Sequence, residues 1–271
     1  MIQEQFATQL INEFHQIYRI ENVDCWVNPY EILSAGKESG LIECVANAIS
    51  IDELKKKIGN MSIREFFINY YGHPDSKSKL DLIYKYFSIN LLEFKDAINN
   101  FIQSLAGYSL LCYFLQIKDR HNQNIMLDNL GHIVHIDFGF LLSNAPGKGI
   151  KFENAPFKLT NEFVECMGGV NSKIFKKFRS LLWKGFVALV KHSEKIIILV
   201  EMMYLGLGDT LGCFMNKEET INELKSRFFP YKNMETKDYF RHVDSLIEQS
   251  INNWRTTCYD RCQYFLQGIL Y

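Results

Sequence analysis

Hydrophobic residues recur at steps of three and four along residues 2–20, with polar residues between them, and this spacing predicts an amphipathic helix. The segments Tyr30–Ser34 and Leu41–Val45 are separated by a stretch that contains glycine and serine. They predict two strands joined by a turn. Ser50 and Ser62 are each followed three residues later by glutamate, which predicts the beginnings of two further helices.

Residues 91–117 form a long, increasingly apolar stretch of helical period, which predicts a buried helix. Residues 124–127 and 133–136 flank a turn that contains Asn and Gly, and they predict a β-hairpin. Residues 143–151 break the periodicity with Gly, Pro and Lys and predict a surface loop long enough to be functional. The remaining chain has helical period over residues 160–168, 172–192, 194–205, 218–228, 236–252 and 255–270.

Composition places the 271-residue chain among ordinary globular proteins, because 47% of its residues are hydrophobic and 23% are charged. This length is enough to bury the core of one large domain or of two lobes. The 30 basic and 31 acidic residues give a net charge of -1. That balance removes the bulk electrostatic argument for nucleic-acid binding, and we expect no nucleic-acid partner.

Seven cysteines are scattered without a C-x-x-C pair, so the pattern indicates neither a disulfide framework nor a zinc site, and we expect reduced, buried thiols. The N-terminus lacks the basic and then apolar order of a signal peptide. The longest apolar run, Ser109–Ile117, is shorter than the roughly 20 residues that a membrane span needs. We therefore expect an intracellular protein that does not span a membrane.

The chemically informative segment is Lys118-Asp-Arg-His-Asn-Gln-Asn124, which follows the predicted buried helix and precedes the hairpin. The hairpin is followed by His135-Ile-Asp-Phe-Gly139. Asn124 and Asp137 therefore flank one hairpin, and we expect them to converge. An amide oxygen and a carboxylate are ligands that magnesium prefers, with water and phosphate in the remaining positions.

In protein kinases a catalytic-loop acid precedes the metal-binding Asn by five positions, as Asp119 precedes Asn124 here, and an Asp-Phe-Gly aspartate holds the metals. The order D-R-H-N-x-N, with His after Arg, resembles the phosphoinositide kinase superfamily. Further segments resemble type III phosphatidylinositol 4-kinases, nearest to the beta form: Asn28–Tyr30, Gly40–Ala48, Ala106–Tyr108, Phe157–Thr160 and Val164–Gly169.

This resemblance implies an α+β, two-lobed protein-kinase-like fold with a predominantly helical large lobe and a truncated small lobe. Residues 1–46 would be the small-lobe remnant and hinge, and 47–271 the large lobe with the catalytic loop (118–124), the metal-binding Asp-Phe-Gly (137–139) and the activation loop (137–160). The implied reaction transfers the γ-phosphate of ATP, with Mg²⁺, to the 4-hydroxyl of phosphatidylinositol.

The sequence departs from the family at its start, because the glycine-containing phosphate loop and the strand lysine that precede this region in relatives are absent. Either the chain is an excerpt of a longer kinase or it is a truncated form. By the resemblance, Glu4 would be the helix acid that pairs with such a lysine, near Tyr30. Two alternatives stay open: a non-catalytic pseudokinase that binds lipid or a partner, and a serine/threonine protein kinase that shares the reversed motif.

Asn124 and Asp137 are the predicted metal ligands, and Asp137 is thereby also catalytic. Asp119 has the spacing of a protein-kinase base, but its two basic neighbours favour its ionised form and make it a weaker proton acceptor. His121 titrates near neutrality, so we favour His121 as the base, with Asp119 orienting it or the inositol hydroxyl.

The resemblance also implies an ATP site between the lobes. The Glu43 carbonyl and the Val45 amide would bond the purine, and Met126 and Ile136 would form an apolar floor under it. From the residues alone, Met126 and Ile136 are equally well explained as ordinary strand residues in the core.

The activation loop carries Lys148, Lys151 and Lys158 but no run of basic residues, which fits unphosphorylated phosphatidylinositol with its single phosphodiester. We expect Lys151 and Lys158 to contact the headgroup, with Lys158 the first choice, although solvated lysines would look the same.

The C-terminal stretch combines aromatic and basic residues: Trp254, Arg255, Tyr259, Arg261, Phe265, Leu266 and Leu270. It predicts a helix that lies in a membrane interface or packs onto the lobe. We expect a cytoplasmic protein with peripheral membrane association, at the Golgi by the resemblance, whose protein recruiters the sequence does not identify.

Overall fold

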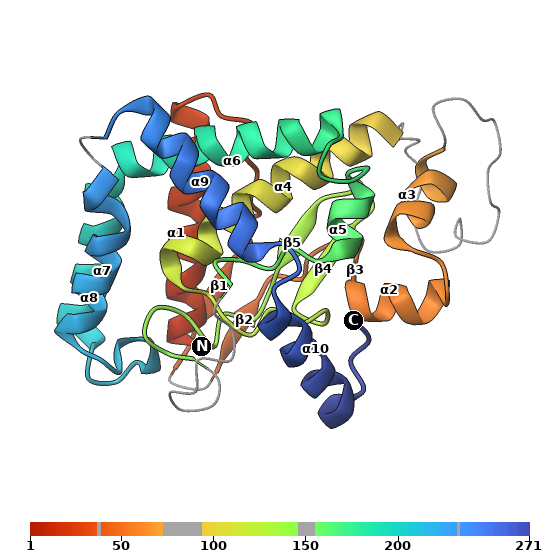
Figure 1. Ribbon diagram of the computed structural model, residues 1–271. Coiled ribbons are helices and arrows are strands. Elements are labelled where there is room, and N and C mark those ends of the chain that lie inside the picture. Colours follow the sequence, from red (N-terminus) through yellow and green to blue (C-terminus); the bar gives the residue numbers. More distant parts are fainter. Residues whose placement is uncertain (37–38, 73–93, 146–154, 232–233) are drawn as a thin grey trace.

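The computed structural model describes residues 1–36, 39–72, 94–145, 155–231 and 234–271. Within them the chain is mostly helical, with short strands in two small antiparallel sheets (Figure 1). This confirms the predominantly helical α+β fold expected from the sequence. The division into lobes after residue 46 stays a prediction.

The N-terminal part of the chain is one long helix and one short hairpin. Helix α1 (Ile2–Ile20) begins without a side-chain cap and packs against α6 and β1. Strands β1 (Ile32–Ser34) and β2 (Gly40–Ile42) pair so that Ile32 lies opposite Ile42. The buried face of α1 consists of apolar side chains about one turn apart: Phe6, Leu10, Phe14 and Ile17.

The residues of the candidate site lie next to the strands of the second sheet. Its strand order is β3 (Ala48–Ser50), β4 (Ile125–Asp128) and β5 (Ile133–His135), all antiparallel. The carboxylate of Asp128 accepts two backbone N–H groups within the turn, and Gly131 supplies a left-handed residue with φ of 90°. The predicted hairpin is therefore confirmed, and local turn chemistry explains it.

Two capped helices follow β3. Ser50 accepts the N–H of residue 53 at the start of α2 (Ile51–Ile58), and Ser62 forms a complete capping box at the start of α3 (Ile63–Tyr71). Helix α4 (Phe94–Leu115) is buried along most of its length and packs along α6, as its near-continuous apolar sequence predicts (Figure 1).

The C-terminal part consists of helices and single turns of 3-10 helix: α5 (Asn161–Cys166), α6 (Lys173–Lys191), α7 (Ser193–Leu207), η1 (Gly212–Phe214), α8 (Glu218–Phe228), η2 (Phe229–Tyr231), α9 (Thr236–Ser250) and α10 (Trp254–Gln267). Helix α9 ends two residues earlier than predicted because Ile251 is extended and forms a parallel bridge with Leu159. Helix α10 ends three residues early, at a left-handed Gly268 with φ of 70°.

All seven cysteines lie in the described part of the chain, and all are free. Cys25, Cys112, Cys166 and Cys213 are buried as expected, whereas Cys44, Cys258 and Cys262 are exposed. No helix among the described residues combines the length and the apolar composition needed to cross a bilayer.

Candidate active site

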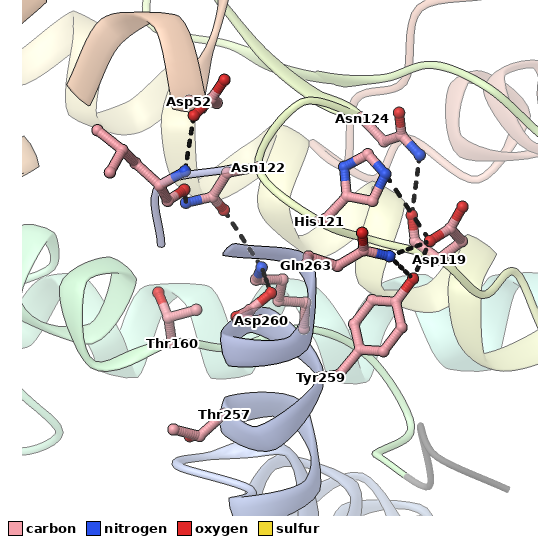
Figure 2. A network of polar contacts seen from close by, with 12 residues as sticks. Asp52, Asp119, His121, Asn122, Asn124, Thr160, Thr257, Tyr259, Asp260 and Gln263 are labelled. Carbon is pink, nitrogen blue, oxygen red and sulfur yellow. Dashed lines mark hydrogen bonds and ion pairs between the residues drawn. The ribbon is translucent and has the colours of Figure 1, made fainter. Parts of the chain in front are cut away.

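The segment 118–124 forms a tight loop between the buried helix α4 and strand β4. Asp119 holds a left-handed backbone with φ of 65°, a conformation that costs free energy in a residue with a side chain. Two hydrogen bonds close the loop on itself. The Asn124 side-chain amide donates to the Asp119 carbonyl at 2.9 Å, and the Asn124 backbone N–H donates to the His121 carbonyl at 3.0 Å (Figure 2).

The segments that carry Asn124 and Asp137 are joined at the open end of the hairpin. The N–H of Ile136 donates to the Asn124 carbonyl at 3.1 Å. Arg120 reaches across the loop and donates to the carbonyls of Ile136, at 2.8 Å, and of Asp137. Its guanidinium also lies 5.6 Å from the centre of the Phe138 ring. Arg120 therefore joins the catalytic loop to the Asp-Phe-Gly turn.

Helix α1 holds the Asp-Phe-Gly turn from the other side. The carboxylate of Glu4 accepts the N–H of Phe138 at 2.9 Å, and Gln3 donates to the carbonyls of Phe138 and Gly139. Burial raises the pKa of Glu4, the Phe138 bond opposes this rise, and the Asp137 charge adds to it. The Tyr30 ring stacks 6.5 Å from Phe138, so Glu4 and Tyr30 face one region, as the resemblance implied.

The side chains of His121 and Asp119 lie next to each other in the loop. The Nε2 of His121 lies 3.8 Å from the Oδ1 of Asp119. Burial lowers the pKa of His121, the Asp119 charge partly reverses this shift, and Arg120 adds to it. The imidazole is thus neutral at pH 7 and able to accept a proton. Its Nδ1 is buried and has no hydrogen-bond partner among the described residues.

Helix α10 contacts this pair directly. The Tyr259 hydroxyl donates to the Asp119 carboxylate, and Gln263 donates to the Tyr259 oxygen at 2.6 Å (Figure 2). Of the two alternatives for this helix, Tyr259 follows the packing one, because it is 7% exposed, whereas Trp254, Phe265 and Leu266 are exposed. The helix packs onto the domain through one face and leaves another in solvent.

The structure corrects the expectation for Lys158. Its ammonium is buried and forms an ion pair with Asp260 at 2.8 Å, and it donates to the Asn122 side-chain oxygen at 3.2 Å. Lys158 therefore links α10 to the catalytic loop, and its ammonium is not available to a lipid headgroup. Lys151 lies outside the described residues, so its contact with the headgroup stays a prediction.

The residues expected around the purine lie on the segment between β2 and β3, on β4 and directly after β5. Glu43 follows β2 and is exposed, and Val45 is half-buried. Met126 in β4 and Ile136 after β5 are also half-buried and pack against the core. Met126 lies opposite Ser50 in the sheet. Their contact with a purine stays a prediction.

The oxygen atoms of Asn124 and Asp137 fit a magnesium ion better than a softer metal. The Asn124 nitrogen is used by the Asp119 carbonyl, which leaves its Oδ1 as the ligand atom, and Asp137 is exposed. The described residues contain no group of three or more His, Cys, Asp or Glu side chains that could hold a metal alone. Two protein oxygens supplemented by phosphates are the usual magnesium arrangement in kinases.

Sequence reasoning gave no role to Arg120, Asp260 or Gln263 and left Tyr259 between a membrane interface and packing onto the lobe. Arg120 lies inside the motif, and its position between an acid and a histidine was the available signal. For α10 the available signal was weaker. Tyr259, Asp260 and Gln263 are spaced so that they lie near one face of an otherwise ordinary helix. Their roles depend on bonding partners that are distant in the sequence.

Comparison with known proteins supports this geometry. The family model described as phosphatidylinositol 3- and 4-kinase matches residues 1–207. The chain is 42% identical to phosphatidylinositol 4-kinase beta 1 of Arabidopsis thaliana over 99% of its length and 22% of that protein. The corresponding values are 41%, 98% and 21% for phosphatidylinositol 4-kinase of Dictyostelium discoideum, and 39%, 99% and 30% for phosphatidylinositol 4-kinase beta of Xenopus tropicalis.

The chain thus spans between a fifth and a third of the length of these curated relatives. The family match covers well over half of the chain and includes both the catalytic loop and the Asp-Phe-Gly turn. The chain belongs to the phosphatidylinositol 3- and 4-kinase family.

Proposed function

We propose that this chain is the catalytic part of a lipid kinase that transfers the γ-phosphate of ATP to the 4-hydroxyl of phosphatidylinositol and yields phosphatidylinositol 4-phosphate. The observation that supports the proposal is that the segments carrying Asn124 and Asp137 are joined at the end of the hairpin, next to the pair of Asp119 and His121. The lipid substrate and the ring position are supported by the names of the relatives.

Phosphoryl transfer depends on positioning and on neutralisation of phosphate charge. Magnesium, when bound with ATP, supplies that neutralisation, and the oxygens of Asn124 and Asp137 would hold it. Arg120 fixes the distance between the two segments that carry these oxygens, because it bonds backbone carbonyls on the Asp137 side. The Glu4 contact with Phe138 fixes the same turn from α1.

His121 would accept the proton that leaves the inositol hydroxyl. Its lowered pKa keeps the ring neutral near pH 7, as a proton acceptor requires. Asp119, 3.8 Å from the imidazole Nε2, would orient the ring and stabilise it once it is protonated. No covalent intermediate on the protein is needed for this reaction.

The outer face of α10 supports peripheral association with a membrane. Trp254, Phe265 and Leu266 are 67%, 83% and 80% exposed, which is unusual for large apolar side chains on one short helix. We expect Phe265→Glu to weaken sedimentation with phosphatidylinositol vesicles. Met202→Glu, on an exposed apolar position of α7, is the control that should leave binding unchanged. The Golgi location stays a prediction from the resemblance.

The test of the kinase proposal is transfer of labelled phosphate from ATP to phosphatidylinositol vesicles in the presence of magnesium. We expect transfer by the chain, loss of at least about a hundred-fold in Asp137→Ala, and loss on chelation of magnesium, because charge neutralisation disappears. Asp209→Ala, which removes an exposed carboxylate in a loop, is the matched control and should keep full activity.

The product also decides between the alternatives. Phosphate on the 4-hydroxyl supports the proposal, and phosphate on another hydroxyl would contradict the ring position. Label on added protein substrate would favour a protein kinase. ATP binding without any transfer, also in a longer chain that includes the phosphate loop and lysine of relatives, would overturn the kinase proposal in favour of a binding module.

A further inference from the structure

The C-terminal helix reaches back to a loop about 140 residues earlier in the chain. Tyr259 and Gln263 lie four residues apart on α10, so their side chains share one face of the helix. The Tyr259 hydroxyl donates to Oδ1 of Asp119, and the Gln263 amide donates to the Tyr259 oxygen at 2.6 Å and to the same Oδ1 at 3.5 Å. Figure 2 shows both side chains directed at Asp119.

These contacts form a relay from an amide through a phenol to a carboxylate. Each donor in such a chain strengthens the next, and bonds to an ionised acceptor are stronger than neutral ones. The accepting atom, Oδ1 of Asp119, is also the atom that lies 3.8 Å from His121 Nε2. The direction in which Asp119 faces His121 is therefore set by a hydrogen bond from α10.

The backbone of Asp119 is itself strained, and such a conformation persists only where surrounding contacts hold it. The residue is in the left-handed region with φ of 65°, where side chains are disfavoured. Its carbonyl is used by Asn124, so a rotation of Asp119 would also disturb a predicted metal ligand. An external donor to the carboxylate holds the residue in one orientation without adding a charge.

Helix α10 is itself anchored on both sides of Tyr259. Asp260 forms the buried ion pair with Lys158, and both side chains are nearly inaccessible to solvent. Beyond the helix, Leu270 accepts from the Asn122 side chain at 2.9 Å and donates to Asp52 at 2.7 Å. The hydroxyl of Tyr259 is thus preorganised by packing, as a supporting residue of an active site must be.

We propose that Tyr259, aided by Gln263, is a positioning residue that holds the Asp119 carboxylate for phosphoryl transfer. This inference rests on the proposed kinase function. Both side chains bond to Asp119 in the catalytic loop, so we expect their loss to affect the chemical step more than ATP affinity.

The experiment compares Tyr259→Phe with Tyr264→Phe, which removes the hydroxyl of an exposed tyrosine on the same helix. Loss of a hydrogen bond to a charged group should lower kcat about ten- to a hundred-fold in Tyr259→Phe, with KM for ATP and the thermal midpoint nearly unchanged. Gln263→Leu should lower kcat about two- to ten-fold, and Gln267→Leu should not. The split between kcat and KM separates positioning from a general loss of structure.

An unchanged or raised kcat in Tyr259→Phe would overturn the inference, because the hydroxyl would then be neutral or restraining. If neither the unmodified chain nor the longer chain with the phosphate loop and lysine shows transfer, the kinase proposal fails separately, and amide hydrogen exchange of residues 118–124 decides the positioning. Faster exchange of this loop in Tyr259→Phe than in Tyr264→Phe supports the inference, and equal exchange overturns it.

Discussion

The ion pair of Lys158 and Asp260 permits a quantitative test because its side chains are only 3% and 6% exposed. Asp260→Asn would leave the Lys158 ammonium facing a neutral amide where a carboxylate now lies at 2.8 Å. Removing one partner of a buried ion pair costs about 3–5 kcal/mol. Because the Asn122 oxygen still accepts from Lys158, at 3.2 Å, we expect the lower end, about 3 kcal/mol. That corresponds to a fall of about 6–12 °C in Tm.

Urea unfolding followed by tryptophan fluorescence measures this loss, and equal m-values show that the two-state comparison is valid. Glu53→Gln is the control, since the Lys57–Glu53 pair is 45% and 57% exposed and should contribute less than about 1 kcal/mol. Replacing both buried partners, as Lys158→Met with Asp260→Leu, should recover most of the stability because no unpaired charge remains. A loss in Asp260→Asn no larger than that in Glu53→Gln would refute the burial argument.

Three further predictions concern packing and pH. In Gly107→Ala the new Cβ would lie 2.3 Å from the Trp26 carbonyl oxygen, so thermal unfolding should show a loss of about 1–3 kcal/mol, whereas Gly206→Ala, with open space around it, should lose none. The pKa of Glu4 is raised by folding, so its contribution to stability is present below the ordinary value of 4.5 and is lost as pH rises through the raised value. Urea titrations should therefore find Glu4→Gln more stable than the unmodified chain at pH 7 but not at pH 4. Burial lowers the pKa of His242, so its contribution to stability is present above pH 6.5, the ordinary value, and is lost as pH falls. His242→Gln should therefore flatten the decline in unfolding free energy between pH 7 and pH 5.

The sequence by itself determined the features that depend on neighbouring residues. The helices follow from apolar spacing and from serine caps, and two of their ends come early: α9 because Ile251 joins a distant strand bridge, and α10 at the left-handed Gly268. The joining of the segments that carry Asn124 and Asp137 was also predictable, because both flank one hairpin whose turn is fixed by Asp128 and Gly131. Few other arrangements are open to two residues at the ends of adjacent antiparallel strands.

Only the tertiary structure decided the roles of Lys158, Tyr259 and Asp260. A single lysine in a loop has the same local sequence whether it faces solvent, a headgroup or a buried carboxylate 102 residues later. Likewise, the spacing of Tyr259 on α10 fits a membrane-facing helix as well as one that holds Asp119. Local sequence sets which residues share a face of an element, but the partner of that face is chosen by the packing of the whole chain, which brings together groups far apart in sequence and removes them from water.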